Sequence, residues 1–269
     1  MPWSAAVRRF RPKHGAVNRF LLVEPDGTLH QYDKRHLFRM ADEHHHYLPG
    51  EQRQVFEWRG WRILPQICYD LRFPVFSRNR NDYDLALYVA NWPAPRALHW
   101  QALLLARAIE NQAYVAGCNR VGSDGNQHEY SGDSQIISPQ GEILSGAEPH
   151  QRARLDAELS LDALNAYRER FPAWQDADRF FAVNGGREVR PPINCRDRLT
   201  QDQGRNQKRQ VKMAARFGNH KIDLRADVEC IPDRRQQNSR RFLPLNGSGR
   251  RQRLGREIFQ TPVAVGFTL

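Results

Sequence analysis

The spacing of hydrophobic and polar residues divides this chain into three parts. Residues 16–183 contain short apolar runs separated by turns, whereas residues 1–15 and 184–269 show no clear period. Residues 85–90 (LALYVA) are continuously apolar, which is typical of a strand buried on both faces. Residues 98–112 carry apolar side chains at helical spacing. Further strands are expected at residues 18–23, 28–32, 54–58, 61–68, 113–118, 134–137, 142–144 and 154–159, and further helices at 75–79 and 162–170. Alternation of strands and helices predicts an α/β or mixed layered fold.

Composition separates the body from the tail at the same place. The chain carries a formal net charge of +11, yet residues 1–183 hold 22 basic and 22 acidic residues. Residues 184–269 hold 19 basic and 8 acidic residues, so the whole net charge lies there. All six tryptophans and all eight tyrosines precede residue 184. We therefore expect a neutral globular body, preceded by an irregular basic leader (1–15) and followed by a basic, low-complexity tail that is disordered by composition.

The basic tail leaves two further interpretations open. Its Lys and Arg clusters could bind nucleic acid, so a basic-tailed nucleic-acid-binding module is one alternative function. The tail lacks interleaved aromatic residues for stacking on bases and lacks zinc-ligand spacing, which makes this alternative the weaker one. The other interpretation is that the leader and the tail are products of translation in a shifted reading frame, because each joins a well-patterned body abruptly.

Cysteine usage indicates the cellular compartment. Cys68, Cys118, Cys195 and Cys230 form no CxxC pair and show no metal-ligand spacing. No secretory leader pattern and no apolar run of membrane-spanning length occurs in the sequence. We therefore predict a reducing, cytoplasmic location and no membrane partner.

One cysteine and one lysine are candidates for covalent chemistry. Cys68 follows the apolar run 61–67 and precedes polar residues, so the strand would deliver its thiol to the rim of a sheet. A thiol has an unperturbed pKa of about 8.5, and a nearby cation raises the thiolate fraction. Lys34 follows an earlier strand and could supply that cation. The alternatives are a small buried hydrophobic residue at Cys68 and a surface charge at Lys34.

Four motifs, in the order YDKRHLF (32–38), ICYDLRFP (67–74), ANWPAPR (90–96) and ARAIENQAYVAGCNRVG (106–122), make the sequence resemble the nitrilase, or carbon–nitrogen hydrolase, superfamily and most closely its omega-amidases. The resemblance implies a four-layer α-β-β-α sandwich. It also implies hydrolysis of the terminal amide of a small 2-oxo acid amide by water, through a cysteine thioester, with release of ammonia. The resemblance implies no cofactor and is compatible with a homodimer, although the sequence does not give the oligomeric state.

The resemblance also implies roles for individual residues. Cys68 matches the nucleophile and Lys34 the oxyanion-binding lysine, with the backbone N–H of Tyr69 as a natural second donor. Glu43 matches a supporting glutamate that orients the lysine, although a solvated loop acid is the alternative. Arg72 could bind a substrate carboxylate, or instead pair with Asp70 or Glu110.

Three other features receive different interpretations. Trp92 lies either over the substrate pocket or in the ordinary core. Glu110 is expected to anchor its helix to neighbouring strands or to the Lys34 loop. We predict no metal site, because the adjacent residues His44, His45 and His46 should point in different directions.

One family feature has no match in the sequence. The superfamily's third catalytic group is a glutamate in a Leu-Pro-Glu context well before the lysine, and only 33 residues precede Lys34. We therefore interpret residues 16–183 as a carbon–nitrogen hydrolase domain that is incomplete at its N-terminus. Without that base we expect the chain to be inactive or nearly so, which makes a catalytically inactive remnant the second alternative function.

Overall fold

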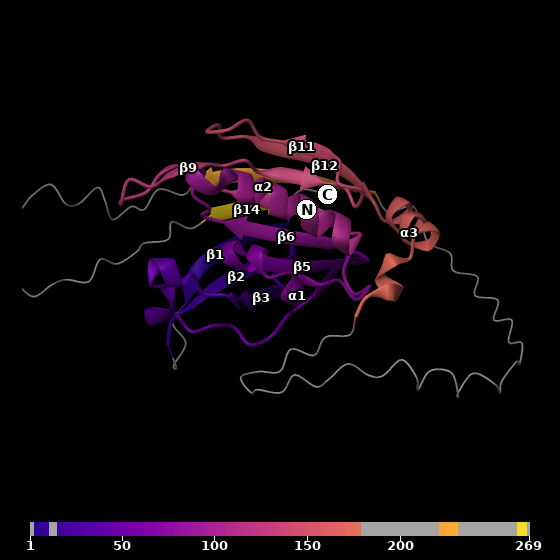
Figure 1. Cartoon of the computed structure of the whole chain (residues 1–269), viewed down its shortest axis with the longest axis horizontal. Helices are drawn as coiled ribbons and strands as arrows, with labels where there is room; N and C mark the ends of the chain where they lie inside the picture. Colours follow the sequence, from indigo (N-terminus) through magenta and orange to yellow (C-terminus); the bar gives the residue numbers. More distant parts are fainter. Residues whose placement is uncertain (1–2, 11–14, 179–220, 231–262, 268–269) are drawn as a thin grey trace, which may run out of the picture.

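The computed structural model describes residues 3–10, 15–178, 221–230 and 263–267 (Figure 1). Within them the chain forms two six-stranded sheets and the two-stranded pair β8 (Val121–Ser123) and β9 (Glu129–Ser131). Sheet A has the order β12 (Arg154–Ser160), β13 (Lys221–Cys230), β14 (Val263–Phe267), β1 (Trp3–Phe10), β2 (Val17–Val23) and β3 (Leu29–Asp33). Sheet B has the order β11 (Ile143–Gly146), β10 (Gln135–Ile137), β7 (Tyr114–Asn119), β6 (Leu85–Ala90), β5 (Trp61–Ile67) and β4 (Phe56–Trp58).

The centre of sheet B is parallel and is built from the most apolar strands. β6 lies between β5 and β7, and every residue of β6 is buried. The connection from β6 to β7 runs through helix α2 (Ala97–Asn111), since parallel neighbours require a crossover. The strand predicted at 85–90 and the helix predicted at 98–112 are therefore confirmed.

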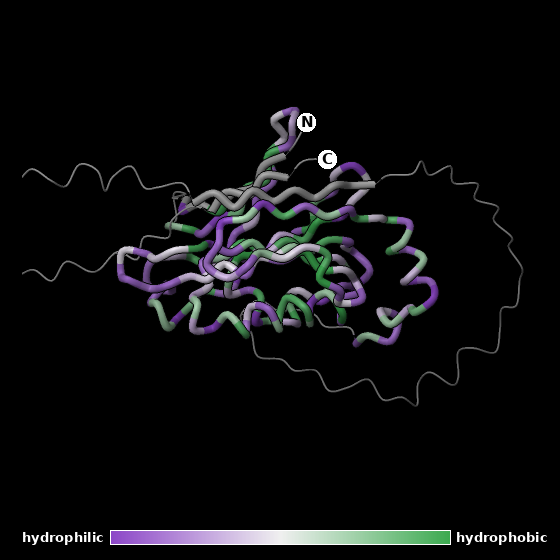
Figure 2. The backbone as a smooth tube through the Cα atoms, turned by 90° about the horizontal axis from the view of Figure 1, so that it is seen from above, coloured by the Kyte–Doolittle hydropathy of each residue, from purple (hydrophilic) through white to green (hydrophobic). Residues whose placement is uncertain are grey.

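The two sheets enclose the larger part of the core. From sheet A, Phe20, Leu22 and Tyr32 join the same buried cluster as Trp61 and Leu87 of sheet B. Figure 2 shows the hydrophobic stretches running through the middle of the molecule and hydrophilic stretches in its outer loops. The hydrophobic effect on these inward faces therefore holds the sheets together.

Helix α2 covers the other face of sheet B, as Figure 1 shows in front of β6. Its buried residues Trp100, Leu104 and Ala108 pack in one cluster with Tyr88 and Val115. The mixed α/β architecture is thus confirmed. Three layers of the predicted sandwich, a helix and two sheets, are found in the part of the chain that the structure describes.

The leader and the tail differ from the prediction. Trp3–Phe10, predicted to be irregular, form β1, which pairs with β2 from Phe10↔Val17 to Ser4↔Val23. Two tail segments, expected to be disordered, form β13 and β14 and lie between β12 and β1. Composition missed the two tail strands because β12 and β1, with which they pair, are distant in sequence, and it missed β1 because residues 1–15 show no clear period. The rest of the tail lies outside the described residues.

Short helices fill the connections. They are α1 (Pro74–Ser77), α3 (Leu161–Arg170) and the 3-10 segments η1 (Arg39–Ala41), η2 (Glu43–His45), η3 (Cys68–Arg72), η4 (Ala94–Arg96) and η5 (Ala173–Asp176). Among the described residues, none of the helices is both long and apolar enough to cross a bilayer.

The close approach of α2 to β7 depends on Gly117. A Cβ atom there would lie 2.3 Å from Leu104 Cδ1 and 3.0 Å from Trp100 Cζ2. We expect Gly117→Ala to lower the free energy of unfolding by about 1–3 kcal/mol through overpacking, measured by urea denaturation. Gly146→Ala, whose new Cβ would meet Ile143 at an ordinary 3.5 Å, is the matched control. Equal stability of the two variants would contradict this account of the packing.

Candidate active site

Cys68 lies where β5 ends and η3 begins, at the carboxyl end of the parallel strands. Its φ of 45° is in the left-handed region, which is uncommon for a residue other than glycine and marks local backbone strain. The Sγ atom donates a weak hydrogen bond to the carbonyl oxygen of Asn91, 3.8 Å away, just after β6. The thiol therefore lies half-buried in the gap between the ends of β5 and β6 rather than within the strand.

Lys34 and Glu43 form a buried ion pair. Lys34 directly follows β3, its Nζ lies 2.7 Å from Glu43 Oε2, and the two side chains are 1% and 4% exposed. The same carboxylate accepts hydrogen bonds from the backbone N–H of Phe38 at 2.6 Å and from Asn18 Nδ2 at 3.1 Å. With three donors holding it, Glu43 is placed to fix the direction of the ammonium group. The alternative of a solvated loop acid is wrong.

Asp70 connects the two segments that carry Lys34 and Cys68. Its carboxylate is fully buried and accepts hydrogen bonds from Tyr32 Oη at 2.8 Å, from the backbone N–H of His36 at 2.9 Å and from the backbone N–H of Ile67 at 3.0 Å. His36 Nδ1 lies 2.8 Å from the same carboxylate. One side chain of η3 thus holds together the end of β3, the loop after it and the end of β5.

Burial and nearby charge act in opposite directions on the lysine. Burial disfavours the ammonium form and by itself lowers the pKa of Lys34. The negative charges of Glu43 and Asp70, and that of Cys68 when its thiol is ionised, outweigh that effect, so the pKa of Lys34 is raised overall. Lys34 is therefore a cation at neutral pH, and its charge and that of an ionised Cys68 would stabilise each other.

At Cys68 burial is the larger effect, and this corrects the expectation of an activated thiolate. Burial raises the pKa of the Cys68 thiol; Lys34 lowers it, Glu43 raises it, and the net direction is upward. The ammonium group is near enough to stabilise a thiolate, but desolvation of the sulfur is the larger effect. In this arrangement the resting sulfur is a protonated thiol, so covalent chemistry requires a group that removes its proton.

Arg72 and Trp92 lie beside this centre and contact each other. The guanidinium carbon of Arg72 lies 4.8 Å from the centre of the Trp92 ring, and Arg72 Nη2 lies 3.0 Å from His99 Nδ1. Trp92 is 3% exposed, belongs to the α2-side core and donates its indole N–H to the carbonyl of Arg96 at 2.8 Å. Trp92 is therefore a core residue with one face under Arg72.

Tyr69 and Glu110 are placed by their neighbours. The Tyr69 ring packs 4.9 Å from the Phe38 ring, which joins η3 to the Lys34 loop. Glu110 binds Arg107 at 2.9 Å, and Arg107 donates to the carbonyl of Leu71 at 2.6 Å. Glu110 thus helps to anchor α2, but to the turn of Cys68 rather than to the neighbouring strands or the loop of Lys34 that were expected.

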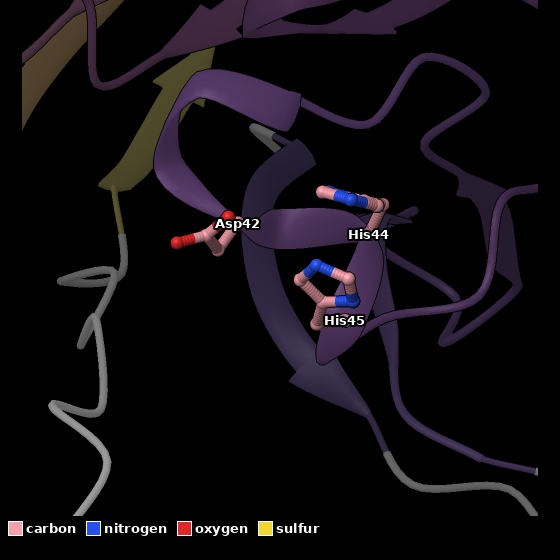
Figure 3. Close-up of side chains that lie close together, drawn as sticks. All are labelled: Asp42, His44 and His45. Carbon is pink, nitrogen blue, oxygen red and sulfur yellow. The ribbon is translucent and has the colours of Figure 1, made fainter.

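The histidine cluster also differs from the prediction. The rings of His44 and His45 lie 3.9 Å apart, and ligating atoms of Asp42, His44 and His45 all lie within 4.8 Å of one another. Figure 3 shows the two rings close together with Asp42 beside them. Adjacent residues point to a common region here because η2 winds tightly.

Sequence reasoning missed the residues that hold the centre in place. Asp70 was considered only as a partner for Arg72, and Asn18 and His36 were not singled out. Buried polar side chains are recognisable from sequence only by their apolar surroundings, and Asp70 stands between Ile67 and Leu71 in such a context.

Comparison with known proteins decides the family. The sequence pattern of the carbon–nitrogen hydrolase family matches residues 5–169, which is more than half of the chain. The chain belongs to the carbon–nitrogen hydrolase family. The match begins within β1, so the family region includes most of the strand that was assigned to the irregular leader.

Two relatives within the family refine the comparison. The omega-amidase YafV of Escherichia coli K12 is 76% identical over 166 residues, covering 62% of this chain and 65% of the relative. The 2-oxoglutaramate amidase of Bacillus subtilis is 36% identical over 176 residues, covering 64% and 66%. The chain therefore spans slightly less than two thirds of the length of either carbon–nitrogen hydrolase.

A solved structure supports the fold assignment. A Xanthomonas campestris CN-hydrolase superfamily protein with an arsenic adduct in its active site is 48% identical and superposes with a TM-score of 0.62. The superposition covers 66% of this chain and 69% of that carbon–nitrogen hydrolase.

The contacts of Asp70 generate a stability prediction. Asp70→Asn keeps the shape of the side chain but replaces one accepting oxygen by an NH₂ group, which is a donor. Because both oxygens of Asp70 accept hydrogen bonds, this NH₂ group would face a donor of Tyr32, His36 or Ile67. We expect a loss of about 1–3 kcal/mol in the free energy of unfolding, measured by urea denaturation. The exposed Asp178→Asn is the control and should change stability little. Unchanged stability of the Asp70 variant would contradict the connecting role.

The opposed effects on the thiol generate a reactivity prediction. Because Lys34 lowers the pKa of Cys68, Lys34→Met should move the pH profile of Cys68 alkylation by iodoacetamide to higher pH. Mass spectrometry of the Cys68 peptide measures the rate separately from the other cysteines. Buried Cys118 is the internal control, and its profile should not move. An unshifted Cys68 profile would show that the two groups do not interact.

Proposed function

We propose that this chain carries an omega-amidase type site, which hydrolyses the terminal amide of a small 2-oxo acid amide and releases ammonia. One observation carries the proposal. Lys34, which is 1% exposed and held by Glu43, lies close enough to Cys68 for the charge of each group to alter the pKa of the other. A thiol beside a fixed, desolvated cation is suited to form and stabilise a tetrahedral oxyanion.

In the proposed reaction the Cys68 sulfur, after losing its proton, attacks the amide carbonyl carbon. The C=O π electrons move to oxygen, and the oxyanion is stabilised by the Lys34 ammonium group and the backbone N–H of Tyr69. The C–N bond breaks, the nitrogen takes up a proton and leaves as ammonia, and a thioester remains on Cys68. Water then attacks the thioester, which releases the carboxylic acid and regenerates the thiol.

The proton acceptor determines whether the reaction proceeds. Glu43 already accepts three hydrogen bonds, so we assign it to orientation of Lys34 rather than to proton transfer. We assign no described residue to the base, and the raised pKa of Cys68 favours the thiol form. The inactive remnant stays a prediction, which the assay of amide hydrolysis tests.

Arg72 supports a substrate that carries a carboxylate. Its guanidinium carbon lies over the Trp92 ring in a cation–π contact, 4.8 Å from the ring centre, and Arg72 belongs to the same turn as Cys68. A planar guanidinium binds carboxylates through paired hydrogen bonds. Pairing of Arg72 with the 2-oxo acid end would direct the amide end toward the thiol, in agreement with the names of the omega-amidase and 2-oxoglutaramate amidase relatives.

The direct test is ammonia release from 2-oxoglutaramate by the purified full chain. If the site is an active amidase, contrary to the expectation of an inactive chain, Cys68→Ala should lower its turnover by about three orders of magnitude or more, because it removes the nucleophile. Cys118→Ala is the matched control: this cysteine is buried in the core between the sheets, so the variant should lose stability but keep its turnover.

Two outcomes separate the candidate functions. Turnover that disappears only in the Cys68 variant supports the amidase. Ammonia release that is undetectable although Cys68 still reacts with iodoacetamide supports the inactive remnant. The homodimer, the cytoplasmic location and the weaker nucleic-acid alternative stay predictions.

A further inference from the structure

The turn η2 presents two different faces. Glu43 points inward, is 4% exposed and holds Lys34, whereas the neighbouring Asp42 and His45 are exposed and His44 is partly exposed. The outward face carries one carboxylate and two imidazoles. None of these three side chains has a part in the proposed amide hydrolysis.

The three outward side chains offer ligand atoms in a compact group. Their atoms all lie within 4.8 Å of one another, and the His44 and His45 rings lie 3.9 Å apart (Figure 3). In a tetrahedral zinc site with bonds of about 2.0–2.2 Å, neighbouring ligand atoms lie about 3.4 Å apart. Side chains at the surface can rotate by the small amount that separates these two arrangements.

One imidazole nitrogen of this group is not engaged by the described part of the protein. A neutral imidazole nitrogen has a lone pair available for a metal ion. His44 Nδ1 is buried without a hydrogen-bond partner among the described residues. The positive charge of Arg39 opposes binding of a cation, and the carboxylate of Asp42 offsets it.

We propose that Asp42, His44 and His45 bind a divalent first-row transition metal ion, with Zn²⁺ as the ion that suits two imidazoles and one carboxylate best. Water completes the coordination on the exposed side. The ion links the residue before Glu43 to the two residues after it, and therefore stabilises the turn that positions Lys34. The proposal does not depend on amidase activity.

The experiment titrates Zn²⁺ into the full chain, freed of metal by chelation and dialysis, in a calorimeter. We expect a site of one ion per chain, whose affinity falls by about tenfold or more in His45→Asn, since loss of even an outer-sphere partner commonly costs that much. His46→Asn is the matched control: the same substitution, one residue later, at an exposed histidine outside the cluster. Its affinity should equal that of the unaltered chain.

A second measurement identifies the ligands. Co²⁺ bound to imidazole and carboxylate gives ligand-field absorption without the thiolate-to-cobalt charge-transfer band, so that band would place the ion on a cysteine and overturn the proposal. The proposal is also overturned if no ion binds, if His45→Asn binds as tightly as the unaltered chain, or if His46→Asn loses as much affinity. Because every readout is binding, failure of the amide-hydrolysis assay leaves these outcomes unaffected.

Discussion

The candidate site depends on one buried carboxylate that accepts hydrogen bonds from both sides of the core. Asp70 accepts hydrogen bonds from a hydroxyl of β3, from a backbone N–H of the loop after β3 and from a backbone N–H at the end of β5. A buried charge without such donors would be strongly destabilising, so the two sheets must meet in one register to satisfy it. The same contacts bring Lys34 and Cys68 together, since each lies within two residues of an Asp70 donor. Folding and site geometry are thus determined by the same bonds.

The electrostatics around Cys68 show why a cation beside a thiol is not by itself an activated nucleophile. Lys34 favours the thiolate, but much of its charge is balanced by Glu43, and the surrounding protein removes the water that would solvate an anion. In the proposed reaction, the charge of Lys34 stabilises the oxyanion when it forms. Preorganised charge of this kind acts on the transition state more than on the resting sulfur.

The parts of the fold that depend on local pattern could be predicted from sequence. The run 85–90 and the helical spacing from Leu98 onward correspond to β6 and α2, and the motifs around Lys34, Glu43 and Cys68 indicate the residues that the structure brings together. The tail strands could not be predicted, because they pair with strands far along the chain, and the strand at 3–10 was missed because its residues show no clear period. The direction of the Cys68 pKa also required the structure, since desolvation depends on how the sheets close over the sulfur.

The arrangement of sheet A has a consequence for biosynthesis. β1 begins at Trp3 and pairs with β14, where Trp3 faces Phe267, so the first strand meets a partner made hundreds of peptide bonds later. Until that strand has emerged from the ribosome, β1 and β12 each present a row of unsatisfied backbone groups. Closing so long a loop is entropically slow, and exposed strand edges recruit other chains in the meantime. The nascent protein therefore carries these two open edges during the interval between making its first strand and its last.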